Sequence, residues 1–291
     1  IDTGGISIRQ YIVEHSIDQG ATHAQEVVVA PPASNFVSFR LSHLLALTQV
    51  RVRVAAANLP SCLPPSRWSN ALAVNTTVAT APGPPVNVQL ESVTGGAATL
   101  SWIPNDDSGG DIIQLYEAHV WQLGSTQPFT SYVFPYEHPG TATGQVGGME
   151  ADSAYLVSVS AVNSVGESMH STPVEILTSQ PTVPSAPLDA RAISRTGGSV
   201  SLSWQPPLDT GGTPADIEYK ALRLDETFAC STSALSCVVW GLSSNSTYVF
   251  IIDARNTIGS SAASATVTVK TGSPSSPNSP LPPTLLLSDT P

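Results

Sequence analysis

The stretch Tyr248-Val249-Phe250-Ile251-Ile252-Asp253-Ala254-Arg255-Asn256 decides the fold, because it alternates apolar side chains and ends in Ala-x-Asn. Residues 155–163 and 50–58 repeat the same pattern. Successive side chains of a strand point to opposite faces, so an alternation with a period of two predicts a β-strand. Three copies of one strand therefore indicate an internally repeated, β-rich chain.

One face of each run is expected to be buried and the other solvated, as in antiparallel sheets that cover a core on one side. The outward positions include Ser158 and Ser160 in the second run and Arg51 and Arg53 in the first. The inward positions are Val50, Val52, Val54 and Ala56, then Tyr155, Val157, Val159 and Ala161, and finally Tyr248, Phe250, Ile252 and Ala254.

Two further marks recur in a fixed order along the chain. Leu-Ser-Trp ends at Trp102 and again at Trp204, and Asp-x-Gly-Gly occupies residues 2–5, 107–110 and 209–212. Glycine pairs supply turn conformations that other residues avoid. The period of about 100 residues is the size of one β-sandwich domain. The marks therefore predict an all-β fold class of tandem sandwiches.

The ordered set of marks resembles the fibronectin type III family. In the last copy, Pro184-Ser185-Ala186-Pro187 precedes the first strand, and residues 242–248 are similar to that family's Leu-x-Pro-x-Thr-x-Tyr corner. The resemblance implies immunoglobulin-like β-sandwiches. In these, the structural core residues are Trp102 and Trp204 between the sheets and Tyr155 and Tyr248 at the tyrosine-corner position.

The repeats divide the chain into domains. A first repeat is expected at residues 1–80, a second at 81–180, a third at 181–272, and a Ser/Pro-rich linker that fits the start of another repeat at 273–291. The first repeat lacks the front strands, and Val50 replaces its corner tyrosine. The chain is therefore interpreted as a segment of a longer polypeptide. Its short proline-rich joints are semi-rigid spacers, which predicts an extended rod.

Charge narrows the choice of partners. The 291 residues carry a net charge of −11, and the only lysines are Lys220 and Lys270. Such a chain offers no counter-charge to nucleic acid or to an anionic membrane surface. No apolar run reaches the roughly 18 residues that a membrane span needs. We expect its partners to be other protein chains, copies of itself included, with glycans as further candidates.

The cysteines bear on the compartment. Cys230 and Cys237 lie close together in the third repeat and predict a local disulfide, and with it an oxidising environment. The alternative is a pair of buried free thiols in a cytosolic protein. Cys62 has no obvious partner, which leaves it either free or paired outside this segment.

No motif predicts catalysis, a metal site or a cofactor. The acidic loop at residues 105–111 lacks the downstream glutamate of an EF-hand, and turn chemistry accounts for its residues. No nucleophile elbow or phosphate loop is present. The histidines show no His-x-x-x-His spacing for zinc; they are His15, His23, His43, His119, His138 and His170. The chain is predicted not to be an enzyme.

Two Asn-x-Ser/Thr triplets are N-glycosylation sequons. Asn245 lies in the turn before Tyr248, an exposed place suited to a glycan, whereas Asn75 lies within the last strand of its repeat. Arg67-Trp68-Ser69 resembles a single copy of the Trp-Ser box of cytokine receptors. A local cation–π contact between Trp68 and Arg53 is the favoured interpretation of that stretch.

Tandem repeats, short joints, low charge, paired cysteines and sequons together predict a non-catalytic structural or adhesive role. The chain would be a segment of a larger extracellular or cell-surface protein, such as a filament or a surface appendage. Three alternatives stay open, which are the ectodomain of a cell-surface receptor, a spacer of a secreted hydrolase, and an intracellular cytoskeletal or ciliary scaffold.

Overall fold

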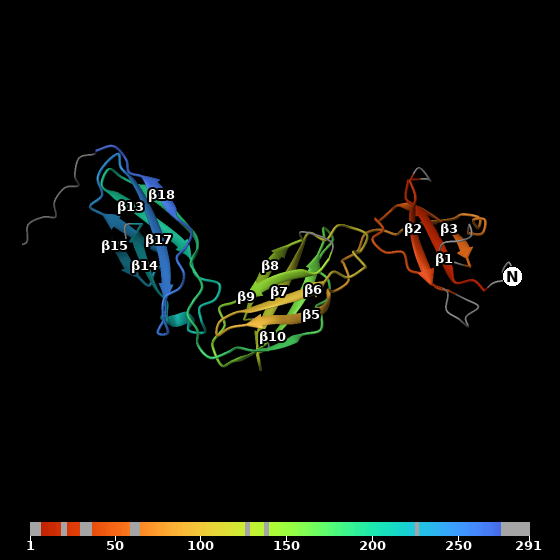
Figure 1. Ribbon diagram of the computed structural model, residues 1–291, viewed down its shortest axis with the longest axis horizontal. Helices are drawn as coiled ribbons and strands as arrows, with labels where there is room; N and C mark the ends of the chain where they lie inside the picture. The colour runs from red at the N-terminus through yellow and green to blue at the C-terminus, as the bar shows by residue number, and fades with distance from the viewer. Residues whose placement is uncertain are drawn as a thin grey trace, which may run out of the picture. The chain divides into compact units, whose positions relative to one another are not determined.

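The computed structural model describes residues 7–18, 22–29, 37–58, 65–125, 129–136, 140–224 and 227–274, and strands dominate them (Figure 1). The first Asp-x-Gly-Gly motif, Cys62, His138 and the predicted linker beyond residue 274 lie outside the described residues. The strands that precede residue 140 are β1 (Gln10–Ser16), β2 (Ala24–Val29), β3 (Gln49–Ala57), β4 (Leu72–Asn75), β5 (Val86–Val93), β6 (Ala98–Ile103), β7 (Leu115–Gln122) and β8 (Thr130–Pro135).

The strands that follow residue 140 are β9 (Ala142–Val146), β10 (Ala154–Val162), β11 (Val174–Leu177), β12 (Leu188–Arg195), β13 (Ser199–Gln205), β14 (Glu218–Arg223), β15 (Phe228–Thr232), β16 (Ser236–Trp240), β17 (Thr247–Arg255) and β18 (Val267–Lys270). A single 3-10 turn, Pro214–Asp216, is the helical element of the described residues.

One four-stranded sheet recurs three times with the same topology. Its strand orders are β2-β1-β3-β4, β8-β7-β10-β11 and β15-β14-β17-β18. Three-stranded sheets accompany the second and third copies, with orders β5-β6-β9 and β12-β13-β16. In the described part of residues 7–80, β2-β1-β3-β4 is the sheet that forms. The predicted all-β class of tandem sandwiches is confirmed.

The chain forms two compact units, and the predicted second repeat contributes to both. The first unit comprises Ile1–Glu91, Leu100–Gly144 and Tyr155–Glu175, and the second comprises Ser92–Thr99, Gln145–Ala154 and Ile176–Pro291. In the first unit, Trp102 is fully buried beside Tyr116, with ring centroids 5.4 Å apart. In the second unit, Trp204 packs against Tyr219 at 5.5 Å. Each tryptophan therefore anchors an aromatic core.

The predicted inward faces hold well in two of the three runs. Tyr155, Val157, Val159 and Ala161 of β10 are buried, as are Phe250, Ile252 and Ala254 of β17, and Tyr248 is half-buried. In β3 the expectation is only partly right, because Val50 is buried but Val52, Val54 and Ala56 are half-buried.

The inward side chains of β3 are only half-buried because β3 belongs to a single sheet, β2-β1-β3-β4. Val52 and Val54 line an apolar cavity of about 410 Å³ together with Tyr11, Val13 and Phe39. No second sheet covers this face among the described residues before residue 80. An incompletely covered sheet face keeps apolar side chains in contact with solvent, which explains the intermediate burial of β3.

The predicted solvated face of β10 is wrong. Ser158 and Ser160 are 1% and 0% exposed. Side chains from the neighbouring strand β7 and from the segment after β10 cover them, because His119, Glu167 and His170 all lie within hydrogen-bonding reach of the two serine hydroxyls. Small polar residues predict a solvated strand face only where no polar side chain covers them, and here Ser158 and Ser160 lie beneath a polar cluster.

Candidate functional site: the linker clamps

The asparagine that ends each Ala-x-Asn run holds the linker in front of its own repeat. Asn163 is 3% exposed, and its Nδ2 donates to the carbonyl oxygens of Thr80 at 2.7 Å and Ser108 at 3.1 Å. Its Oδ1 accepts from the backbone N–H groups of Val165 at 2.9 Å and Gly166 at 3.1 Å. One side chain thereby joins the linker, the Gly-Gly loop and the turn after β10.

The third repeat builds the same arrangement from its own residues. Asn256 is 5% exposed, and its Nδ2 donates to the carbonyls of Thr182 at 2.7 Å and Thr210 at 3.3 Å. Its Oδ1 accepts from the backbone N–H groups of Ile258 and Gly259. We call Thr80, Asp107–Gly110 and Asn163 the first linker clamp, and Thr182, Asp209–Gly212 and Asn256 the second.

The Asp-x-Gly-Gly loop completes each clamp through its backbone. In the second clamp, the Thr182 N–H donates to the Gly211 carbonyl at 3.0 Å, and the Gly211 N–H donates to Oδ1 of Asp209 at 2.7 Å. In the first, the equivalent bonds join Thr80 to Gly109 at 2.8 Å and Gly109 to Asp107 at 3.0 Å. Aspartate is required because its short carboxylate caps its own turn.

The second glycine of each loop accepts a hydrogen bond from a chain corner that lies earlier in the sequence. Within the first unit, the Ala46 N–H donates to the Gly110 carbonyl at 2.7 Å, and within the second unit the Ala151 N–H donates to the Gly212 carbonyl at 3.1 Å. The residue after each alanine, Leu47 or Asp152, has a positive φ. These bonds lie inside a single unit in both cases.

Threonine hydroxyls fix the shape of these corners. Thr76 Oγ1 accepts from the Thr48 N–H at 2.8 Å and donates to the Leu45 carbonyl. Thr178 plays the same part for Ser153 and Glu150. Since the same bonds recur in both places, the Gly-Gly loop, the asparagine and the corner form one repeated device for holding a linker.

Replacing Asn163 with alanine is expected to lower the free energy of unfolding around the first clamp by about 2–3 kcal/mol. The substitution removes the four hydrogen bonds of a buried side chain. The carbonyl and N–H groups that lose their partner are only partly buried, so water replaces some of the lost bonds and the total stays well below four times the roughly 1–3 kcal/mol of an unsatisfied buried group. Hydrogen-exchange mass spectrometry of peptides that contain β10 measures the loss. Asn70→Ala, at an exposed asparagine, is the control and should change exchange little. Equal protection in the two variants would contradict the clamp.

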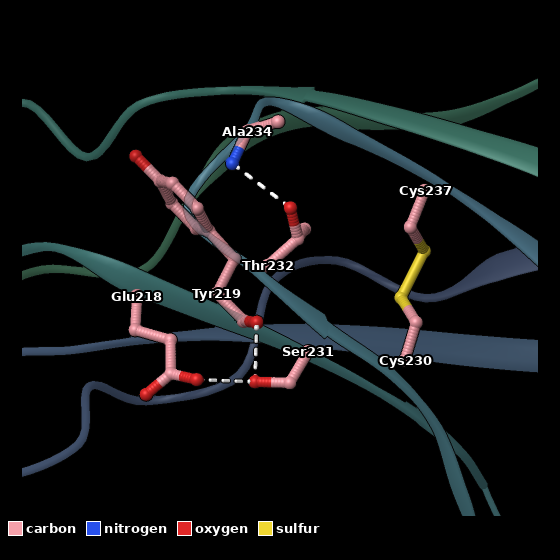
Figure 2. Close-up of a disulfide and its surroundings, with 7 residues drawn as sticks. All are labelled: Glu218, Tyr219, Cys230, Ser231, Thr232, Ala234 and Cys237. Carbon is pink, nitrogen blue, oxygen red and sulfur yellow. Dashed lines mark hydrogen bonds between the residues drawn. A yellow bond between two sulfur atoms is a disulfide. The ribbon is translucent and has the colours of Figure 1, made fainter.

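The predicted cysteine pair forms a disulfide in the third repeat (Figure 2). Cys230 lies on β15 and Cys237 on β16, and these strands belong to different sheets of the sandwich. Close to it, the Ser231 hydroxyl donates to Glu218 at 2.6 Å and the Ala234 N–H donates to Oγ1 of Thr232 at 3.0 Å. The disulfide therefore links an edge of one sheet to an edge of the other.

Replacing both cysteines with serine is expected to lower the unfolding free energy of the third repeat by at most about 2.5 kcal/mol. The loop between Cys230 and Cys237 is short, so the chain entropy that the bond removes from the unfolded state is limited. Calorimetry of the whole chain, with the third-repeat transition assigned by exchange of β17 peptides, measures the change. A loss well above this value would show that the disulfide also organises the native connection between the two sheets.

The other predicted residues fall in distinct places. Trp102, Trp204 and Tyr155 are buried in the cores, and the hydroxyl of Tyr248 accepts from the Ser243 N–H at 2.8 Å, the upstream backbone contact of a tyrosine corner. That hydrogen bond, with the Arg223 guanidinium 5.1 Å from the ring, holds the pKa of Tyr248 below its usual range. Asn245 and Asn75 are both exposed, and their glycosylation stays a prediction.

Two minor interpretations can also be compared with the structure. The Arg53 guanidinium lies 4.8 Å from the ring centroid of Trp68, which confirms the local cation–π contact. In the acidic loop, Asn105 Oδ1 accepts from the Asp107 N–H, Asp107 Oδ1 accepts from the Gly109 N–H, and Asp111 accepts from the Ser164 hydroxyl. Asn105 and Asp107 therefore cap the turn of their own loop, as its chemistry suggests.

His119, Glu167 and His170 form a cluster that no sequence motif predicted. His119 lies on β7, whereas the other two follow β10, so strand pairing brings together residues 48 positions apart. Their side chains approach closely enough to form a candidate metal site. The signal available in the sequence was the pair of hydroxyls on one face of β10, Ser158 and Ser160, which can hydrogen-bond to polar side chains above that face.

No helix among the described residues is long and apolar enough to cross a membrane.

The sheet topology and the linker clamps define this protein as a chain of tandem β-sandwich repeats. A comparison of the sequence with protein-family models identifies the family. The model of the fibronectin type III domain matches residues 83–177 and 185–270. The chain therefore belongs to the fibronectin type III family. The predicted resemblance is confirmed over these two regions.

The curated relatives that the chain matches are much longer than the chain, which spans less than a third of each one named here. The chain is 27% identical over 212 residues to phosphatidylinositol phosphatase PTPRQ of Rattus norvegicus, a match that covers 72% of the chain and 9% of that protein. It is 29% identical over 273 residues to contactin-5 of Danio rerio, covering 90% of the chain and 24% of the relative. A solved structure of chicken CNTN1 FN1-FN3 domains aligns over 91% of the chain and 90% of its own, with 18% identity and a TM-score of 0.34.

Proposed function

We propose that this chain is a non-catalytic structural or adhesive segment of a larger extracellular or cell-surface protein, and that it contacts other protein chains. The observation that carries the proposal is the pair of linker clamps. Both buried asparagines and both Asp-x-Gly-Gly loops are fully engaged in holding one linker to its repeat. Because the same residues hold a linker at equivalent positions of two repeats, they support a chain whose role is to join successive domains. The disulfide supports an oxidising compartment.

The proposal includes the division of the chain. Residues 1–80 are proposed as a further repeat of the same kind, although the family model matches only the two later regions. The sheet order β2-β1-β3-β4 supports this, because it equals the order of the four-stranded sheets in the second and third repeats. The Ala46 corner, which contacts Gly110 as Ala151 contacts Gly212, supports it further.

Surface labelling of the native protein tests the location. Intact cells of the source organism are treated with a membrane-impermeant amine reagent, and the protein is digested without reduction. We expect labelled peptides, a Cys230–Cys237 linked peptide, and a glycan on Asn245. A protein that stays unlabelled on intact cells but reacts after lysis, with both thiols alkylated, would replace this proposal with the intracellular scaffold.

Contact with other chains is tested separately. The tag-free chain is coated on a surface, and binding of source cells is compared with binding to the same chain after reduction, alkylation and unfolding. Specific binding to the folded chain alone is the expected result. Binding that does not distinguish the two forms would remove the adhesive part of the proposal and leave a spacer.

A second candidate follows from one comparison. The match to a rat protein whose name describes a phosphatase supports a role as a non-catalytic segment of a larger enzyme or receptor, since the chain spans only 9% of that relative. The full-length coding sequence distinguishes the two: a catalytic domain in the same polypeptide would favour the second candidate.

A further inference from the structure

His119, Glu167 and His170 converge on the outer face of the β7–β10 pair within the first unit. One ligand atom from each of the three lies within 4.8 Å of the other two. Nε2 of His119 lies 3.1 Å from Oε1 of Glu167. Two ligands about 2.0–2.1 Å from a tetrahedral zinc ion are about 3.3 Å apart, so this pair already has nearly the spacing of zinc ligands.

To bind one ion, the three ligand atoms must come closer together, and two of the three side chains are exposed and able to move. His170 and Glu167 are exposed, whereas His119 is partly buried with 15% of its side chain accessible. Closing the cluster from 4.8 Å to ligand spacing requires a shift of about 1.5 Å, which exposed side chains accommodate by rotation. The partly buried imidazole therefore provides a fixed ligand, and the two exposed groups close on it.

The buried serines of β10 supply the outer shell that metal sites use to orient their ligands. Ser160 Oγ donates to Oε1 of Glu167 at 2.6 Å. Ser158 Oγ lies 3.1 Å from Nδ1 of His170, and a hydrogen bond at Nδ1 leaves Nε2 for a metal ion. These contacts give both buried hydroxyls of β10 a hydrogen-bond partner in the cluster.

Trp121 closes the apolar side of the cluster. Its ring stacks on His119 with centroids 5.8 Å apart and meets the edge of His170 at 5.7 Å, while the two imidazoles are 4.5 Å apart.

We propose that His119, Glu167 and His170 form a binding site for a divalent transition-metal ion of the zinc type. Two imidazoles and one carboxylate are a ligand set that zinc accepts, and imidazole ligands favour zinc, copper and nickel over calcium and magnesium. Water completes the coordination, because the exposed side of the cluster faces solvent. The site does not depend on the adhesive role.

Zinc titration of the tag-free chain at about pH 7.5, in competition with a chromophoric chelator, tests the proposal. We expect saturable binding of one zinc ion, and at least a tenfold loss of affinity for His170→Gln or Glu167→Gln, since even outer-shell changes cost 10–100-fold. His23→Gln is the matched control, because His23 also lies beside a glutamate, at 3.4 Å from Glu14, in the first unit. The control should bind as the unaltered chain does.

A second readout reports on the site itself. Cobalt or copper bound beside Trp121 should quench part of the tryptophan emission, and Trp121→Phe should remove that quenching while zinc binding persists. Circular dichroism confirms that each variant is folded, and His170→Gln, at an exposed position, keeps the test valid if His119→Gln does not fold. Absence of saturable binding, or equal affinity in the His170, Glu167 and His23 variants, would overturn the proposal.

Discussion

Replacing Trp102 with alanine is expected to lower the free energy of unfolding of the second repeat by about 3–5 kcal/mol, the usual cost of emptying a large aromatic site in a core. Trp102 is 0% exposed and contacts Tyr116 and Phe134, with ring centroids 5.4 Å and 5.6 Å away. All three rings lose contacts together, and the space left between the sheets is too large to be closed by small movements.

Hydrogen-exchange mass spectrometry of the whole chain is the suitable measurement, because a chain of several repeats does not unfold in two states. Peptides from β6 and β7 report the second repeat, and peptides from β17 serve as an internal reference. Trp240→Ala is the matched control, since Trp240 is 70% exposed on β16. A loss below about 1 kcal/mol for Trp102→Ala would show that the tryptophan does not organise this core.

Replacing Gly211 with alanine is expected to cost about 2–5 kcal/mol in the third repeat, through two separate effects. Its φ of +70° is unfavourable for an alanine by about 1–2 kcal/mol. A Cβ would also overlap the carbonyl oxygen of Thr182, so that the linker has to move, which adds a cost typical of overpacking, about 1–3 kcal/mol. The shift would break the bond between Asn256 and Thr182.

Gly241→Ala separates the two effects. Gly241 has a φ of +76°, but a Cβ there would meet nothing within 4 Å. It therefore carries only the conformational cost and should lose about 1–2 kcal/mol. Exchange of the amides in the linker and in β17 distinguishes the variants, because only Gly211→Ala should release the second clamp. Equal losses in both variants, with the linker amides still protected, would show that the loop does not hold the linker.

Much of the fold could be predicted because its marks repeat. Trp102 and Trp204 stand in the same three-residue context, and β10 and β17 alternate over nine residues, so local pattern and core position agree. β3 has the same alternation but weaker burial. Alternation specifies which face a side chain takes, but only a second sheet determines how deeply that face is buried.

The site residues were predictable in part. The asparagine and the Asp-x-Gly-Gly loop recur in the sequence and could be recognised there. Their partners could not, because these are the backbone carbonyl oxygens of Thr80 and Thr182, and every residue type has such an oxygen. The histidine cluster has no sequence motif, because a metal-binding motif is recognised by the short spacing of its ligands within one strand, helix or loop. His119 and His170 come from separate segments, and the pairing of β7 with β10 is needed to bring them together.

The linker clamp has a consequence for how such a chain can lengthen. The second repeat carries both complementary parts in its own sequence, with Gly110 and Asn163 for the linker before it and the Ala151 corner for the loop that follows. Each of these bonds has a backbone atom at one end or both, and the side chains involved are the recurring asparagine and aspartate, so the match survives divergence of the surrounding side chains. A tandem gene duplication of such a unit creates a working junction between the two copies and keeps the junctions on either side. New copies can then acquire different surfaces without a new interface having to evolve between neighbours.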